Sequence, residues 1–279
     1  MINKDIGSVT QSYSKLPKNL LELEINLKKE KNMTIEYDNG YDMYEKYKES
    51  SPISLYVQKH TLFNILGDLD GKSILELGCG NGFFTRLLKQ NGAAQVVGVD
   101  LSEKMLESAI QQETRKPLGI AYVHRDICDL GQMGHFDMVV AAFLLNHANT
   151  KEKLLEMCQN IFLNLKVGGR FVALNDNVQQ PPESYSLCEK YGLTKHISAP
   201  LQEGTPITLT FTISGDRSIS LVDYYLSKAT YELAFQQAGF KSFRWHAPQI
   251  SPEGIEKFGE EFWQDVINYP PLVGIECVK

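Results

Sequence analysis

Residues 73–84 read SILELGCGNGFF, a pattern that indicates one particular local structure. The five residues 73–77 form a short, mostly apolar run of the kind that makes a buried strand. Three glycines follow at alternate positions, and the segment 83–90 then reads as a helix that ends at Asn91-Gly92. A strand, a glycine-rich loop and a helix in this order are typical of the first unit of an open α/β sheet.

The same alternation continues on the carboxyl side of this unit. Strand-like apolar runs recur at residues 95–99, 120–124, 136–142 and 170–174, with helical patterns at 103–112 and 151–165. Strands that alternate with helices pair in parallel through right-handed crossovers, so they form an open sheet covered on both faces. In two further segments, 207–213 and 218–226, apolar and polar residues alternate as in strands, which predicts an antiparallel insertion. The last patterns are a helix at 230–238 and strands at 242–246 and 273–278.

We therefore expect an α/β fold of the Rossmann-like kind, with a doubly wound, mostly parallel, seven-stranded sheet, an N-terminal helical lid and a small antiparallel β insertion. The chain divides into an N-terminal extension at 1–32, a helical lid at 33–66, a cofactor-binding core at 67–180, a substrate-side insertion at 181–228 and a C-terminal completion of the sheet at 229–279. Tyrosines spaced three to four residues apart lie on one side of the lid helix. For Tyr41 and Tyr47 we favour core packing.

Composition and charge limit the classes of function. The chain has 28 Lys and Arg against 34 Asp and Glu, a formal net charge of -6, so it lacks a broad positive field for a nucleic-acid backbone. Its five cysteines lie far apart, without the close pairs of a zinc site, so we expect reduced thiols and no metal. The first ten residues are polar, and the longest apolar run, 138–145, is too short to span a bilayer. These features predict a cytoplasmic protein, monomeric or homodimeric, without a nucleic-acid or membrane partner.

The glycine loop and the next strand end point to a bound nucleoside. The loop reads E-x-G-x-G-x-G, with Phe83 where the third glycine of the dinucleotide pattern G-x-G-x-x-G would stand. Asp100 ends the second predicted strand, where an acidic side chain can accept hydrogen bonds from the two hydroxyls of a ribose. Both NAD and S-adenosylmethionine contain that ribose, so the acid alone does not distinguish them. The competing interpretation of Asp100 is a strand-end aspartate that caps the next helix.

Three segments, ILELGCGNG at 74–82, VGVDLS at 97–102 and FDMV at 136–139, resemble the class I S-adenosylmethionine-dependent methyltransferases in order and spacing. The resemblance covers about residues 35–175 and implies S-adenosyl-L-methionine as the cofactor. It implies that the glycines line the methionine and ribose part, that Asp100 binds the ribose, that Leu101 packs on adenine and that Asp126 holds the adenine amino group. The cofactor-binding residues expected on this basis are Tyr37, Tyr44, Glu76, Gly78, Cys79, Gly80, Gly82, Asp100, Leu101, Met105, Asp126, Ile127, Phe143 and Leu144.

A closer resemblance, to small-molecule N-methyltransferases of the toxoflavin synthase type, is carried by GAAQVVGVD at 92–100, AGF at 238–240, FRW at 243–245 and FW at 262–263. It implies a small-molecule methyl acceptor and N-methylation of a heterocyclic secondary metabolite. We expect Phe211, Tyr224 and Tyr225 of the insertion to roof the acceptor pocket, since aromatic walls suit a flat heterocycle. The alternative is a hydrophobic underside without ligand contact. Trp245 and Trp263 are expected to be structural.

Methyl transfer is an in-line displacement on an activated methyl group, so the protein contributes mainly alignment and a dry pocket. His147, just past the fourth predicted strand, is a candidate general base, and a packing role is equally compatible with the sequence. An NAD-dependent oxidoreductase is the first alternative function. The spacing of the glycines, which differs from the dinucleotide pattern, and the position of Asp126 argue against it. A second is a non-catalytic S-adenosylmethionine-binding protein. A nucleic-acid methyltransferase is disfavoured by the acidic charge and by Asn146-His147-Ala148, which departs from an Asn-Pro-Pro base-flipping motif.

Overall fold

The computed structural model describes residues 44, 46–214 and 217–279. The predicted N-terminal extension and the tyrosines Tyr37 and Tyr41 lie outside the described residues. Tyr47 is 1% exposed and packs in the core, as predicted.

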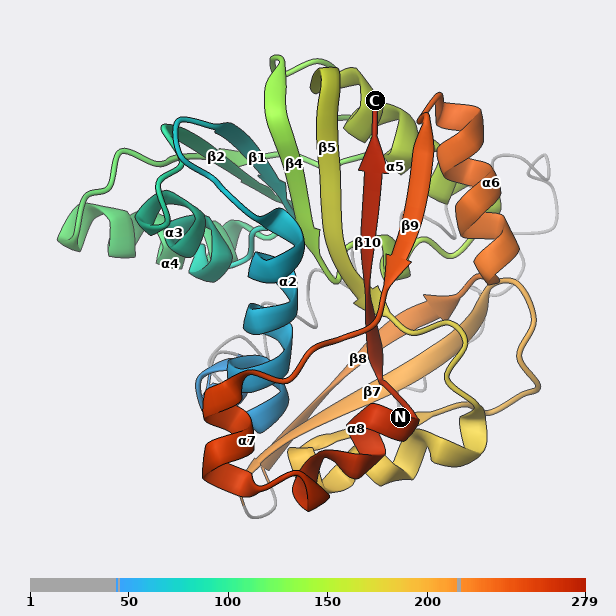
Figure 1. Ribbon diagram of the computed structural model, residues 1–279. Coiled ribbons are helices and arrows are strands. Elements are labelled where there is room, and N and C mark those ends of the chain that lie inside the picture. Colours follow the sequence, from blue (N-terminus) through green and yellow to red (C-terminus); the bar gives the residue numbers. More distant parts are fainter. Residues whose placement is uncertain (1–43, 45, 215–216) are drawn as a thin grey trace, which may run out of the picture.

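Seven strands form one sheet in the order β3-β2-β1-β4-β5-β10-β9 (Figure 1). Their bounds are β1 Ser73–Leu77, β2 Gln95–Asp100, β3 Ala121–His124, β4 Phe136–Ala142, β5 Leu165–Asp176, β9 Ser242–His246 and β10 Leu272–Val278. Neighbours among β1 to β5 pair in parallel, and β10 is antiparallel to both β5 and β9. The predicted mostly parallel seven-stranded sheet is therefore confirmed.

Successive residues of the central strands face opposite sides of the sheet, which explains their almost continuous apolar sequence. Ile74 of β1 joins the hydrophobic cluster that includes helices α2 and α3, and Leu75 joins the cluster that includes α5 and α6. In the sheet Leu75 lies beside Val97 of β2 and Val139 of β4. The helices that accompany the sheet are α2 Lys59–Leu66, α3 Phe83–Gln90, α4 Glu103–Arg115, α5 Lys151–Leu163 and α6 Lys228–Ala238. Helices thus cover both faces, the doubly wound arrangement that the sequence predicts.

The carboxyl ends of β1, β2 and β4 meet at one edge, because these strands are parallel neighbours. From β1 the sheet grows in one direction, through β2 to β3, and from β4 it grows in the other direction, to β5. The strand order therefore reverses between β1 and β4. Ligands of open α/β sheets bind in the crevice at such a reversal. The glycine loop after β1, Asp100 at the end of β2 and the residues after β4 all lie there.

The insertion is a separate three-stranded antiparallel sheet, in the order β6-β7-β8. Its strands are β6 Leu193–His196, β7 Thr205–Ser214 and β8 Arg217–Tyr225. Figure 1 shows β7 and β8 beyond the lower end of the main sheet, at the carboxyl ends of the parallel strands. Leu209, Phe211 and Leu221 belong to the same hydrophobic cluster as α2 and α3, so the insertion packs on the core. The sequence predicts only β7 and β8, because β6 has four residues and too short an alternation to register.

Short helices complete the wall around the insertion. They are the π-helical turn η2 Ser54–Gln58, which runs directly into α2, the 3₁₀ segments η3 Leu145–His147, η4 Pro182–Tyr191 and η5 Glu261–Trp263, and the helices α7 Pro252–Phe258 and α8 Gln264–Asn268. The segments from 252 to 268 are not predicted by the sequence, since elements of three to seven residues carry little periodicity. Trp263 is fully buried, stacks on Tyr191 and donates its indole N–H to the Gly254 carbonyl at 3.0 Å. Its predicted structural role fits these contacts.

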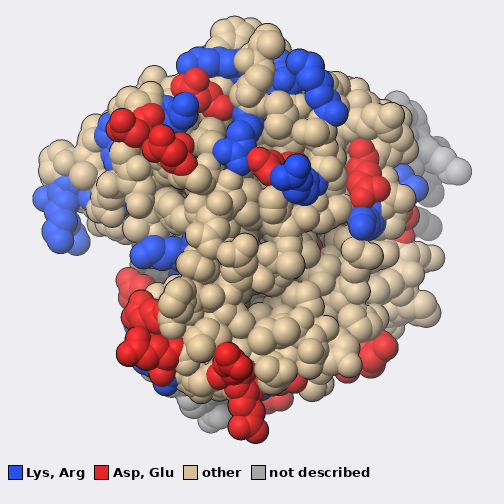
Figure 2. All heavy atoms as spheres, viewed as in Figure 1, with Lys and Arg blue, Asp and Glu red and all other residues tan. Residues whose placement is uncertain are grey.

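One face of the molecule can be compared with the charge argument. On the face shown in Figure 2, acidic and basic side chains are interspersed, and no continuous basic area is seen among the described residues. Within residues 44, 46–214 and 217–279, no helix has the length and apolarity needed to cross a membrane.

Candidate functional site

The glycine loop after β1 holds a backbone conformation that side chains resist. Gly78 and Gly80 have φ angles of 67° and 53°. A Cβ on Gly78 would stand 3.2 Å from Leu144 Cδ1, which is tighter than ordinary contact. The loop therefore needs glycine both for its backbone angles and for the close approach of the segment after β4.

Asp100 fixes the glycine loop to the end of β2. The backbone N–H of Gly80 donates to Asp100 Oδ2 at 2.6 Å, and that of Ser102 donates to Oδ1 at 2.9 Å. Burial raises the pKa of Asp100, and these backbone N–H groups act in the opposite direction. The carboxylate is thus held at the floor of the crevice with both oxygens oriented. Helix capping at this point falls to Ser102, whose Oγ accepts from Met105 N at 3.2 Å.

A cavity of about 780 Å³ opens at this point and is lined by most of the predicted cofactor-binding residues. These are Tyr44, Glu76, Gly78, Cys79, Gly80, Asp100, Leu101, Met105, Phe143 and Leu144, together with His147. A second cavity of about 480 Å³ adjoins it through Gly78, Asp100, Leu101, Leu144 and His147, and is also lined by Asp126 and Ile127. Gly82 lines neither cavity, since it precedes α3 with φ 82°, and a Cβ there would collide with the Tyr122 side chain. Lys48, Phe84, Ser102 and Ala142 line the first cavity and are not predicted by the sequence.

Glu76 is a buried acid at the end of β1. Its side chain accepts a hydrogen bond from the Thr85 hydroxyl of α3. Burial raises the pKa of Glu76 to about 8, although the Thr85 bond and the charge of Lys48 act to lower it. The Lys48 ammonium lies 5.1 Å from the ring centre of Phe84 and 5.5 Å from that of Tyr44, so it stays in place beside the cavity.

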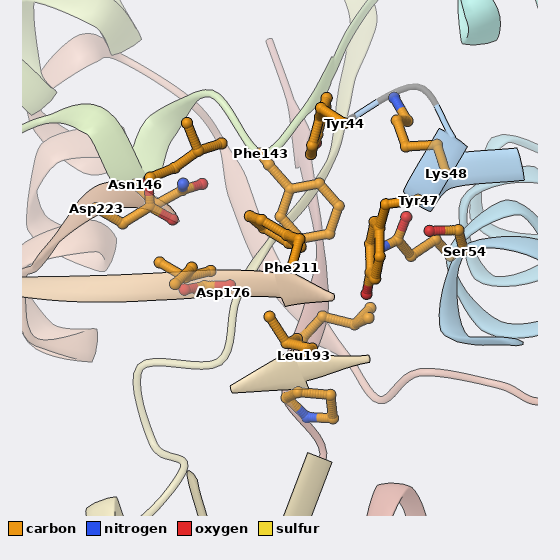
Figure 3. A pocket seen from close by; sticks show the side chains of 15 residues that line it. Tyr44, Tyr47, Lys48, Ser54, Phe143, Asn146, Asp176, Leu193, Phe211 and Asp223 are labelled. Atoms are coloured by element: carbon orange, nitrogen blue, oxygen red, sulfur yellow. The ribbon is translucent and has the colours of Figure 1, made fainter. Parts of the chain in front are cut away.

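Another cavity, of about 520 Å³, lies between the main sheet and the insertion; we call it the insertion cavity. Its aromatic walls are Tyr44, Tyr47, Phe143 and Phe211, and Phe211 contacts both tyrosines edge-on. Figure 3 shows Asn146, Asp223 and Asp176 toward one side and Lys48, Tyr47 and Ser54 toward the other. Of the three aromatic residues predicted to roof a pocket, Phe211 lines the insertion cavity, whereas Tyr224 and Tyr225 are not among its lining residues.

Phe143 lies where the cavity built on the glycine loop meets the insertion cavity; we call these two the large cavities. Tyr44, Lys48 and Phe143 line both of them, so the cavities adjoin. Among the described residues Phe143 is the single non-glycine residue with positive φ, at 59°. A bulky residue in this conformation is strained, and such strain is concentrated at functional sites. The packing of Phe143 against the hydrophobic core holds it in this conformation at the junction.

Two buried carboxylates enter the insertion cavity. Asp176 at the end of β5 lies 3.3 Å from the Lys195 ammonium of β6, which also donates to the Pro271 carbonyl at 2.9 Å. Burial raises the pKa of Asp176 to about 6, and the charge of Lys195 counteracts the rise. The second carboxylate, Asp223 of β8, has its Oδ1 3.0 Å from His147 Nδ1. Neither amide atom of the buried Asn146 has a hydrogen-bond partner within the described part of the chain.

His147 is buried together with its carboxylate partner. The His147 side chain is 10% exposed and that of Asp223 is 7% exposed. Burial by itself would lower the pKa of His147, but the negative charge of Asp223, with smaller contributions from Asp100 and Asp176, produces a net rise. The structure thus brings the predicted candidate base together with an acid that the sequence does not predict.

Part of the chain is similar to known proteins. Residues 74–169 match the family described as "Methyltransferase domain". An "Uncharacterized protein" of Haemophilus influenzae is 36% identical over 42% of this chain and 49% of its own length. The ribosomal protein L11 methyltransferase of Burkholderia multivorans is 33% identical over 43% of this chain and 37% of its own length. The chain thus spans half or less of the length of these curated relatives.

Solved structures with the same fold cover more of the chain. An S-adenosylmethionine-dependent methyltransferase from Mesorhizobium loti has a TM-score of 0.59 and 21% identity, over 83% of this chain and all of that one. A DhpI–SAH complex has a TM-score of 0.53 and 18% identity, over 88% of this chain and 95% of that one. Residues 74–169 thus resemble a methyltransferase domain, and the chain has the fold of these solved structures.

Proposed function

We propose that this protein is an S-adenosylmethionine-dependent methyltransferase that acts on a small molecule. The observation that carries the proposal is the pair of adjoining cavities, one built on the glycine loop and Asp100, the other walled by aromatic rings. They share Tyr44, Lys48 and Phe143, so a ligand in one would meet a ligand in the other at these side chains. Two-substrate transfer chemistry needs this arrangement, because the reacting atoms must be held in contact.

The residues around the first cavity suit S-adenosylmethionine. The Asp100 carboxylate is oriented to accept hydrogen bonds from ribose hydroxyls, and Leu101 and Met105 offer apolar contact for a purine ring. Lys48 also lines this cavity, and its ammonium is suited to the carboxylate of an amino acid. When bound, S-adenosylmethionine supplies a methyl group activated by its sulfonium. The chain's own residues orient the acceptor and exclude water. A structural neighbour in complex with SAH supports the same cofactor.

For the acceptor we propose a flat nitrogen heterocycle that is N-methylated, as in enzymes of the toxoflavin synthase type. Four aromatic rings line the insertion cavity, and flat rings pack well between aromatic walls. The unpartnered amide of Asn146 offers both a donor and an acceptor to polar ring atoms, which lowers the cost of leaving that amide buried. The names of the L11 methyltransferase relatives point instead to a protein acceptor, but their similarity covers less than half of this chain.

The test is titration calorimetry of the purified protein with S-adenosylhomocysteine and with NAD. We expect micromolar binding of S-adenosylhomocysteine, weakened roughly tenfold or more by Asp100→Asn, a loss of about 1.4 kcal/mol or more. Asp129→Asn is the matched control, because Asp129 is exposed and lines none of the cavities described above. Circular dichroism melts verify that both variants fold.

The other outcomes identify the competing functions. Preference for NAD over S-adenosylhomocysteine would overturn the proposal in favour of an oxidoreductase. Tight binding of S-adenosylhomocysteine, without methyl transfer to any compound in a screen of heteroaromatic amines and lactams, would favour a non-catalytic binding protein.

A further inference from the structure

His147 and Asp223 connect the two large cavities from opposite sides. His147 belongs to η3, directly after β4, and lines the cavities that contain the glycine loop and Asp100. Asp223 belongs to β8 of the insertion and lines the insertion cavity. Their side chains meet at 3.0 Å, between His147 Nδ1 and Asp223 Oδ1. The pair therefore spans the boundary at which the ligands of the two cavities would react.

The carboxylates around His147 make its imidazole a stronger base. Asp223 is in direct contact, and the carboxylates of Asp100 from β2 and Asp176 from β5 act from further away. Arg125, Asp126 and Lys153 line the smaller adjoining cavity on the remaining side. A buried imidazole that faces a carboxylate can take up a proton because the resulting cation is paired at once. The same logic operates wherever a carboxylate orients a histidine base.

We propose that His147 accepts the proton that the methyl acceptor loses, with Asp223 as the positioning residue, and that the acceptor consequently carries an N–H or O–H at the reacting atom. This inference rests on the proposed function. The acceptor heteroatom forms the new bond to the methyl carbon, the carbon–sulfur bond breaks, and its electron pair stays on sulfur. The electron pair of the N–H or O–H bond stays on the heteroatom, and the proton goes to His147 Nε2, since Nδ1 faces Asp223.

A tertiary amine or thioether acceptor would give a different requirement. Such an acceptor has no proton at the reacting atom, so a buried base at the boundary would have no role in the transfer. The proposal therefore selects secondary or aromatic N–H groups, lactams and phenol-like hydroxyls over alkylated amines.

The experiment is an NMR titration of the protein with ¹³Cε1-labelled histidine, in the free state and saturated with S-adenosylmethionine or S-adenosylhomocysteine. His147→Gln assigns the resonance. Asp223→Asn should lower the His147 pKa by roughly one unit or more, and Asp223→Glu should restore part of it. A sulfonium carries a positive charge and a thioether does not, so S-adenosylmethionine should lower the His147 pKa by about 0.5 unit or more relative to S-adenosylhomocysteine. A purely structural ion pair far from the reacting sulfur would not respond to that difference.

His246 provides an internal reference. Its Nε2 lies 3.0 Å from Glu276 Oε2, at the β9–β10 edge of the sheet, and neither residue lines a cavity described here. Its resonance should respond to Glu276→Gln and not to either nucleoside.

The two hypotheses fail in different ways. If both nucleosides bind and the His147 titration is the same with each, or is unchanged by Asp223→Asn, the proton-accepting pair is refuted and the proposed function stands. If neither nucleoside perturbs any resonance, the proposed function fails and the pair fails with it.

Discussion

At the level of single residues, Glu76 makes stability depend on pH. Its pKa is about 8 in the folded protein because the side chain is buried, against an ordinary value of 4.5. Between these values the folded state holds more protons than the unfolded state, so the contribution of Glu76 to stability is lost as the pH rises. Glu76→Gln should remove this loss, which amounts to at most about 1.4 kcal/mol per pH unit. Urea unfolding from pH 5 to 8.5 measures it. Glu103 is exposed, so Glu103→Gln should show the same pH dependence of the unfolding free energy as the wild type. If Glu76→Gln also shows the wild-type pH dependence, Glu76 is not its source.

Residues that follow a strand directly could be predicted from the sequence, and residues that meet through tertiary docking could not. Gly78, Gly80 and Asp100 stand at strand ends, and the topology of a parallel sheet brings such ends together. Asp223 lies in β8, where alternation indicates a strand but cannot reveal that its side chain faces His147. Lys48 belongs to a helical stretch before the sheet, and its place beside the cavity depends on tertiary packing that the sequence pattern does not reveal.

At the level of elements, the contact between Lys195 and Asp176 ties the insertion to the main sheet. The Lys195 side chain is 3% exposed and that of Asp176 is 11% exposed. Lys195→Met should leave a buried carboxylate without its cation and destabilise the protein by about 3–5 kcal/mol at pH 7. The deficit should shrink at pH 5, where Asp176 takes up a proton, and Asp176→Asn in the same chain should recover much of it. Lys190→Met is the control, because Lys190 pairs with Asp265 while 40% exposed and should cost less than about 1 kcal/mol. Equal losses for the two lysine variants, measured by urea unfolding, would contradict this account.

The predictability of the elements follows their length and regularity. The strands and helices from 73 to 163 were predicted to within a few residues, because alternating β and α units have distinct hydrophobic periods. Strand β5 begins at Leu165, five residues before its predicted start, because Gly168-Gly169 reads as a turn. In the structure both glycines lie within the strand, and their backbones exchange hydrogen bonds with Lys279 at 3.0 Å. Four elements are not predicted by the sequence: β6, η4, α7 and α8. Their structure depends on tertiary packing, which a short sequence pattern does not show.

At the level of the whole molecule, the family likeness and the insertion cavity lie in different parts of the chain. The matched domain ends at residue 169, whereas β6, β7 and β8 form one wall of the cavity. Names given to relatives that share only the core therefore carry little information about the acceptor, because acceptor specificity depends on segments outside the match. The chemistry of the cavity itself is the better guide.

That chemistry predicts where a transferred methyl group should appear. The cavity residues Tyr47, Leu193 and Asp223 are all buried, so the surface of a folded protein or ribosome could not reach between them. With tritiated S-adenosylmethionine and an extract of the source cells, we expect label in the low-mass filtrate and at most background label in the protein and ribosome fractions. With the cofactor below saturation, Asp100→Asn should lower the filtrate signal roughly tenfold, since it weakens cofactor binding, and Asp129→Asn should preserve it. Label that depends on Asp100 but appears on a protein would transfer the acceptor to the macromolecular class and require the insertion to open, because the cavity as it stands admits only a small ligand.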